Sequence, residues 1–239
     1  MNFKRNSVFS VSSCYKGRVI FPSPSDPRRA SSRSVEHLKG ENLMRYLTAL
    51  APVCVLVTLA VGCSASPPSR FYTLSAASGP AATSSNLSIT VGPVSVPVVV
   101  DRPQIVVNEG PNQVRLEEFN RWAAPLQNNI SRVVADNLVL MLGTPRVTLS
   151  TQMLSADADY RAVIEVQSFQ SVPGDAAILN ALWTVSRMKD GKTQTGRTTV
   201  REAVPDKGYD ALAAGHSRAV ARLSQDIADA VAALGRSGQ

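Results

Sequence analysis

The sequence predicts one α+β domain, in which two main amphipathic helices pack on a mixed or antiparallel sheet. Two stretches carry apolar residues at helical spacing, one over roughly 125–142 and one over the last 25 or so residues. Six to eight shorter runs with the composition of strands precede the helices or lie between them. This mixed order of elements favours helices packed on a sheet.

The strands before the first helix are predicted from runs of Val, Ile and aromatic residues. A short strand at 70–74 is followed by a flexible linker up to residue 86, rich in Ser, Ala and Gly. Residues 87–100 form a Val- and Ile-rich run, in which Pro93 and Pro97 indicate a sheet edge or a bulge. Residues 105–107 and 114–116 flank a turn and predict a hairpin.

The first helix begins at Pro125, which suits a first turn, and ends at Gly143, which Pro145 follows. Strands are then predicted at 147–149, 160–169 and 182–188, and the turn Asp190-Gly191 leads into another at 193–200. The last helix is predicted to end at Gly235. Its apolar face consists of Leu212, Ala219, Val220, Leu223, Ile227, Val231 and Leu234.

Residues 44–62 have the order of a secretory signal. Arg45 gives one positive charge, residues 47–61 are apolar, and the small Gly62 stands before Cys63. The apolar run of ~15 residues is shorter than the ~20 that a spanning helix needs. The sequence therefore predicts a lipoprotein signal peptide with Cys63 as the lipidated residue. Cleavage to a secreted protein without lipid is the alternative.

The rest of the chain divides around that segment. Residues 1–43 are rich in Ser, Arg and Pro and are interpreted as a mis-annotated or disordered extension, with Met44 as the true start. Residues 63–86 are interpreted as the lipidated tether, the short strand and the linker, and 87–239 as the domain, with its first strand from about 70. In lipoproteins of enteric bacteria, Ser rather than Asp at the position of Ser64 permits transfer to the outer membrane, so its periplasmic face is the predicted location.

Charge argues against a nucleic-acid partner. The chain has a net charge of +7, but residues 1–43 carry +5 and Arg45 adds one, so the part after Cys63 is almost neutral. Of the cysteines Cys14, Cys54 and Cys63, only the last remains after cleavage, which leaves no internal disulfide.

No catalytic set is predicted, and no cofactor or metal. His216 is the one histidine after Cys63 and lies at the edge of the helical stripe, where a packed or interfacial role is favoured over that of a catalytic base. Asp157 and Asp159 are interpreted as solvated rather than as a cation site. A basic cluster beside the last hairpin turn is interpreted as a solvated edge; it consists of Arg187, Lys189 and Lys192.

Five short motifs resemble the ABC-type transport auxiliary lipoproteins, the PqiC-like group. They occur in family order along the part of the chain after Cys63. The motifs are Ser69–Leu74, Val91–Val94, Asp101–Val106, Phe119–Leu126, and Tyr209–Leu212 with Ala214–Ala219.

The resemblance implies a non-enzymatic, lipid-anchored component of an ABC/MCE-type intermembrane lipid transporter. Such a component docks an MCE-domain protein and the ABC transporter at the outer membrane, as a homo-oligomeric ring. The candidate partner interface is Asp101, Arg102, Gln104 and Trp122, where the motifs cluster. Fold maintenance by these residues is the alternative: a turn capped by Asp101, an intradomain pair of Arg102, and Trp122 packed under the first helix.

Two other functions fit the sequence less well. A solute-binding lipoprotein of an ABC importer usually has two α/β lobes, and the roughly 170 residues after Cys63, with two main helices, are too few for that. A periplasmic hydrolase is disfavoured by the single histidine.

Overall fold

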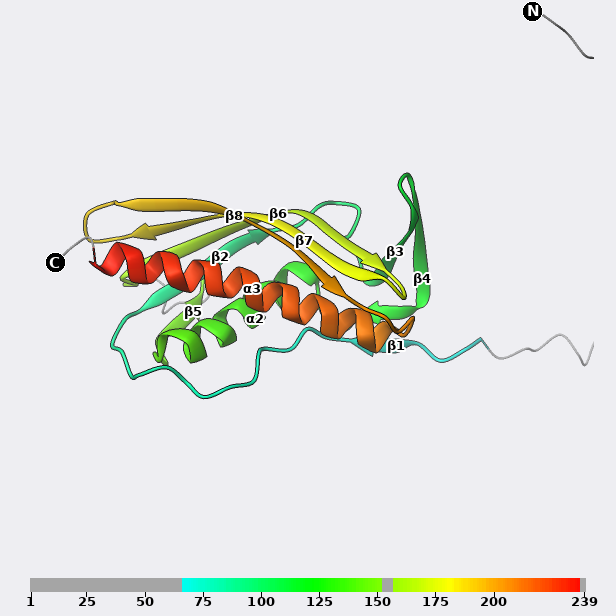
Figure 1. The fold of residues 1–239 in the computed structure, drawn as a ribbon, viewed down its shortest axis with the longest axis horizontal. Helices are drawn as coiled ribbons and strands as arrows, with labels where there is room; N and C mark the ends of the chain where they lie inside the picture. Colours follow the sequence, from blue (N-terminus) through cyan, green and yellow to red (C-terminus); the bar gives the residue numbers. More distant parts are fainter. Residues whose placement is uncertain (1–65, 152–156, 237–239) are drawn as a thin grey trace, which may run out of the picture. The chain divides into compact units, whose positions relative to one another are not determined.

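The computed structural model describes residues 66–151 and 157–236, which form an α+β domain with both helices packed on one sheet (Figure 1). The strands are β1 (Arg70–Tyr72), β2 (Ile89–Ser95), β3 (Gln104–Gly110), β4 (Gln113–Trp122), β5 (Val147–Leu149), β6 (Tyr160–Val172), β7 (Ala176–Arg187) and β8 (Thr193–Ala203). The helices are α2 (Leu126–Leu142) and α3 (Tyr209–Arg236). The predicted signal segment 44–62, the extension 1–43 and Cys63 lie outside the described residues.

The sheet is mixed, and β6 is its centre. On one side, the first half of β6 pairs in parallel with β2, which pairs in parallel with β5. On the other side, β6, β7 and β8 form an antiparallel meander. The far end of β6 pairs with β3 between Val107 and Ser171, and β4 and β1 continue from β3. The β1–β4–β3 ribbon therefore joins the body of the sheet at one end (Figure 1).

The prolines of the first long run have distinct positions. Pro93 lies in the register irregularity between Val91 and Val94 of the β2–β6 pair, and the Gly92–Pro93 peptide is cis. β5 pairs with β2 only from Ile89 to Val91, so Pro93 lies beyond that pairing. The predicted bulge is confirmed. Pro97 begins a turn, because its carbonyl oxygen accepts the N–H groups of Val100 and Asp101 at 3.0 and 3.1 Å.

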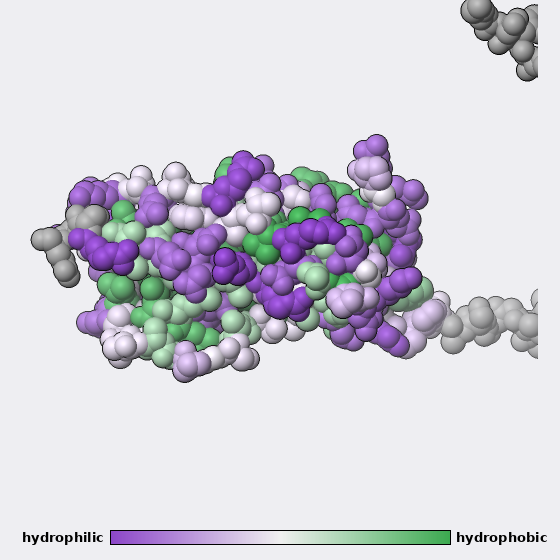
Figure 2. Space-filling view, viewed as in Figure 1, coloured by the Kyte–Doolittle hydropathy of each residue, from purple (hydrophilic) through white to green (hydrophobic). Residues whose placement is uncertain are grey.

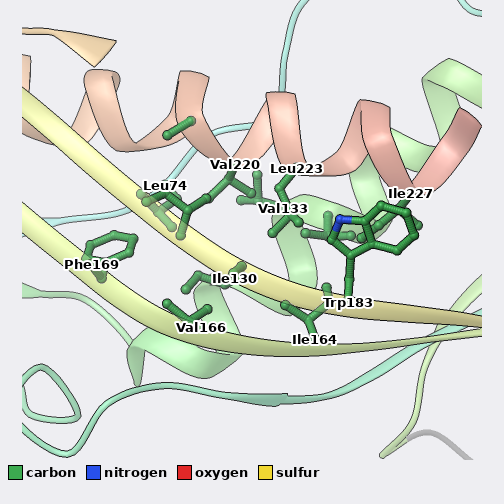
Figure 3. Packing of buried hydrophobic residues seen from close by; sticks show 14 of the residues in the cluster. Leu74, Ile130, Val133, Ile164, Val166, Phe169, Trp183, Val220, Leu223 and Ile227 are labelled. Carbon is green, nitrogen blue, oxygen red and sulfur yellow. The ribbon is translucent and has the colours of Figure 1, made fainter. Parts of the chain in front are cut away.

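The core lies between the helices and one face of the sheet. The inward side chains of β6 alternate with outward ones, as a half-covered strand requires. Figure 3 shows Val220, Leu223 and Ile227 of α3 facing the strands that carry Ile164 and Trp183. Full burial of one such aliphatic side chain contributes about 1.5–3 kcal/mol. The whole predicted apolar face of α3 is buried, which confirms the helical stripe.

Trp183 requires a glycine on the neighbouring strand. Its ring lies so close to Gly196 of β8 that a Cβ there would overlap it. The indole N–H donates to Thr198 Oγ1 at 3.0 Å, so the ring is oriented as well as buried.

Residues 75–86, which we call the strap, pack along α2. Ala77 N–H donates to Asn137 Oδ1 at 2.8 Å, and Ala82 N–H donates to the carbonyl oxygen of Leu140 at 2.8 Å. Ser85 N–H donates to the carbonyl of Gly143 at 2.9 Å. The strap has no regular secondary structure, as expected of a linker, but it satisfies carbonyls that the end of a helix leaves without intrahelical partners.

Both ends of α2 are where the sequence places them. Pro125 precedes the first turn, and Gly143 closes the helix in the left-handed conformation with φ +61°. A side chain at Gly143 would also meet the carbonyl oxygen of Thr83 in the strap. By contrast, α3 continues through Gly235 to Arg236, so the predicted stop at Gly235 is wrong by one residue.

Two further expectations are corrected. β7 begins at Ala176 rather than at 182, because small alanines fill its inward positions where Val or Ile was the expected signal. Arg187 is not on a solvated edge: it is only 8% exposed and donates to the carbonyl oxygen of Leu234 and to Asp190. The ion pair joins Arg187 Nη2 and Asp190 Oδ2 at 2.6 Å, and this hydrogen bonding lowers the pKa of Asp190 to about 2.

Candidate partner-binding site

The loop before β3 and the end of β4 meet at the base of the hairpin. Trp122 N–H donates to the carbonyl oxygen of Pro103 at 2.7 Å, and Ala123 N–H donates to that of Tyr72 at 2.8 Å. These bonds bring two of the predicted interface residues, Asp101 and Arg102, to a third, Trp122. Together with Pro103 and residues 123–125 they line a depression of about 390 Å³.

The charged side chains of this depression form no ion pair within the described part of the domain. Asp101 is exposed, and its backbone N–H closes the turn onto Pro97, but its carboxylate has no hydrogen bond or ion pair there. Arg102 is half-buried, forms no ion pair with a described residue, and its buried Nε has no hydrogen-bond partner. The intradomain pair that fold maintenance would assign to Arg102 is therefore absent from residues 66–151 and 157–236. Buried polar groups of proteins are usually paired, so the unpaired Nε of Arg102 is an exception within the described part of the domain.

Trp122 supports the depression from inside the domain. It is 5% exposed, and its ring meets the rings of Phe169 and His216 edge-on, with centroids 6.1 and 6.4 Å away. This packing agrees with a role in fold maintenance, although the contacts are with β6 and α3. Gln104 is not among the lining residues; it is half-buried and lies opposite Arg121 in the β3–β4 register. The structure thus groups three of the four predicted interface residues.

His216 is fully buried. Its ring stacks on Phe169 with centroids 3.8 Å apart, and Nε2 lies 2.8 Å from Ser171 Oγ. Desolvation lowers its pKa to about 3, so the ring is neutral at physiological pH. The interpretation of His216 as a packed residue is confirmed. Its partners Phe169 and Ser171 were not identified from the sequence, although their spacing of two along a strand places them on one face.

A groove of about 620 Å³ lies where β2 and β5 end and α2 begins. Among its described lining residues there is no His, Cys, Asp or Glu. Arg132 is the one charged lining residue, and it is bonded to Asp136 at 3.0 Å and to the carbonyl of Leu74 at 2.8 Å. The groove therefore offers no general acid or base from these residues.

Asp159 has a structural role. Its Oδ2 accepts the backbone N–H of Ser88 at 2.8 Å and the Ser88 hydroxyl at 2.7 Å. These bonds lower the pKa of Asp159, which is exposed as expected but also holds Ser88. Asp157 is exposed. Within the described ranges no three His, Cys, Asp or Glu side chains gather closely enough to hold a metal ion.

The helices leave a further apolar area. On the face shown in Figure 2, hydrophilic side chains follow α3 and an apolar area lies over α2 at the lower left. Leu140 and Met141 of α2 are half-buried and line a cavity of about 250 Å³ with the strap. Neither described helix is long and apolar enough to cross a bilayer.

Comparison with known proteins gives a family and a fold. A family model described as the ABC-type transport auxiliary lipoprotein component matches residues 72–228, from β1 into α3. A solved protein from Xanthomonas campestris, assigned to the DUF330 family, is 17% identical with a TM-score of 0.59, covering 72% of this chain and 100% of its own. A second solved structure, of an uncharacterised protein, is 19% identical with a TM-score of 0.57, covering 69% and 99%. These two show likeness of fold alone. No match was found among curated protein sequences.

Proposed function

This chain belongs to the ABC-type transport auxiliary lipoprotein family, and from that membership we propose that it docks a lipid transporter at the outer membrane. In this proposal the protein is not an enzyme. It is held by lipid on the periplasmic face of the outer membrane and binds an MCE-domain protein, which connects it to the ABC transporter subunits of the inner membrane. Homo-oligomerisation into a ring would present several copies of the depression to one partner.

The unpaired charges of the depression carry this proposal. Asp101 and Arg102 are adjacent, of opposite sign, and have no internal ion pair among the described residues. A charged group that becomes buried at an interface needs a hydrogen-bonded counter-charge, and such pairs set the register and specificity of a complex. A partner with a carboxylate for Arg102 and a hydrogen-bond donor for Asp101 fits this surface. The apolar residues 123–125 beside these charges would exclude water from the contact.

The anchor is the second part of the proposal. Acylation of Cys63 leaves residues 64–69 as a tether of at most about 20 Å before β1. Two or more acyl chains hold a protein stably on a bilayer, where one chain is marginal. Cells fed labelled palmitate should mark the wild-type protein and not the Cys63→Ala variant. Label that persists in the variant would disprove acylation at Cys63. A gene that begins at Met44 should also complement a deletion fully.

Docking is tested by co-purification with the MCE-domain partner. Arg102→Gln and Asp101→Asn keep the side-chain size and remove the charge, so we expect at least about tenfold weaker binding, equal to ~1.4 kcal/mol. Arg222→Gln, on the exposed face of α3, is the matched control and should bind as the wild type does. Complementation of envelope integrity should follow the same order. Equal binding by all three variants would contradict docking through this depression.

The two other functions have weaker structural support. A hydrolase would need acid and base groups at a groove, and the groove beside β2, β5 and α2 has none among its described lining residues. A solute-binding lipoprotein would enclose its ligand between lobes, whereas this groove lies on the surface of one α+β unit.

A further inference from the structure

Exposed apolar side chains gather on one part of the molecule. Seven large apolar side chains are exposed in the described ranges, and six of them come from β1, β4 and the turn before β3. Those six are Phe71, Val98, Val99, Val114, Leu116 and Phe119. Scattered exposed apolar residues are ordinary, but a concentration on two paired strands and a nearby turn indicates a surface that something covers.

Phe71 and Phe119 are both exposed at the β1–β4 pair. Tyr72 is paired with Trp122, and both are buried. Side chains alternate along a strand, so Phe71 and its pair Arg121 point to the opposite side, away from the core. Phe119 stands two residues before Arg121, in the irregular stretch of β4 between Glu117 and Arg121. Phe71 is 65% exposed and Phe119 is 40% exposed.

The chain itself indicates what this face meets. Phe71 follows Cys63 by eight residues, which span at most about 28 Å when fully extended. Residues 66–69 are exposed and belong to no strand or helix. An acyl group on Cys63 therefore keeps Phe71 within reach of the headgroups of the bilayer that holds it. Arg70, which precedes Phe71, is exposed and adds a positive charge at this end of the chain, whereas Arg121 is paired with Glu118 at 3.8 Å. A basic residue next to apolar ones suits the surface of a bilayer with anionic lipids.

We propose that Phe71 and Phe119, with Arg70, form a membrane-contacting face. The two rings enter the boundary between headgroups and acyl chains, and Arg70 lies at the level of the phosphates. This inference rests on the lipid anchor of the proposed function. It goes beyond it because it fixes which side of the domain rests on the membrane, and so orients the anchored protein with the β1–β4 pair against the lipid.

The test uses the mature lipoprotein reconstituted in vesicles of phosphatidylethanolamine and phosphatidylglycerol. In that protein the Cys63 thiol is acylated and the other cysteines have left with the signal, so a Phe71→Cys substitution supplies a single thiol for an environment-sensitive fluorophore. Phe119→Cys serves as a second probe, and Thr195→Cys on the exposed edge strand β8 is the matched control. Circular dichroism confirms that each labelled protein is folded.

The expected result is blue-shifted emission at positions 71 and 119, quenched at least twofold by brominated lipids, with emission at 195 unchanged. Vesicle flotation separates the two hypotheses. Protein that floats while the probe at 71 behaves like the control would disprove the membrane-contacting face and leave the anchor intact. Protein that fails to float would disprove the anchor and, with it, this inference. A blue shift that brominated lipids do not quench would mean that a second copy or another protein covers the face, and would overturn the proposal.

Discussion

Replacing His216 with glutamine should remove most of the loss of folding stability between pH 7 and pH 5. The ring of His216 is fully buried against Phe169, and its described neighbours Ser171 and Trp122 carry no charge that could stabilise an imidazolium. Desolvation therefore lowers the pKa in the folded protein to about 3, while the unfolded chain keeps a value near 6.5. Glutamine retains a donor for Ser171 and cannot gain a proton.

The sign and size follow from proton linkage. Because the folded pKa lies below the unfolded one, the unfolded state binds more protons as the pH falls, so stability falls with it. Above about pH 6.5 the histidine does not lower the free energy of unfolding. As the pH falls below that value, the wild type loses up to ~1.4 kcal/mol of unfolding free energy per pH unit, until the folded pKa is reached. Between pH 7 and pH 5 the loss is about 2 kcal/mol.

The assay is urea unfolding of the mature chain at both pH values, followed by far-ultraviolet circular dichroism because Trp122 contacts the substituted residue. His216 is the one histidine after Cys63, so no other histidine contributes. Carboxylates titrate mainly below pH 5 and do so equally in both proteins. The reasoning is refuted if the wild type has the same unfolding free energy at the two pH values within about 0.5 kcal/mol. It is also refuted if the glutamine variant loses as much stability between these pH values as the wild type does.

Substitutions at three other positions test the packing. Gly143→Ala places a Cβ at φ +61° against the Thr83 carbonyl, so urea unfolding should show a loss of about 2 kcal/mol or more. Asn137→Ala removes the acceptor of Ala77 N–H, and should cost about 1–3 kcal/mol and speed hydrogen exchange at that amide. Leu223→Asp puts a charge into the core and should abolish the folded circular dichroism spectrum. Leu223→Met should lower the free energy of unfolding by less than about 1.5 kcal/mol. A folded aspartate variant would contradict the helix–sheet packing.

Local signals predicted much of the fold. Pro125 and Gly143 bound α2 because proline and glycine act through their own backbone preferences, whatever lies around them. The turn at Asp190 and Gly191 was predicted for the same reason. The burial of Arg187 could not be predicted in this way, because its acceptor is the carbonyl of Leu234, which lies 47 residues away in the chain.

At the candidate site, too, local motifs were visible in the sequence, whereas contacts between distant residues were not. A motif located Asp101 and Arg102, but only the β1–β4–β3 pairing brings them to Trp122 and leaves Gln104 elsewhere. The outward direction of Phe71 depends on its register with Arg121, 50 residues later in the chain. The sequence indicated that side chains alternate along 70–74. It did not indicate which of the two sides of the strand is exposed.

A lipid tether also transmits mechanical load, and β1 is where that load enters the domain. β1 is a strand of three residues at the edge of the sheet, and the strap that follows it is held by separate hydrogen bonds rather than by a continuous ladder. Force on the anchor would therefore detach these elements before it reached β2, which is paired on both sides. The 19 residues 70–88 would then add up to about 65 Å of chain to the tether, so the distance between membrane and domain could increase while β2 stays in the sheet.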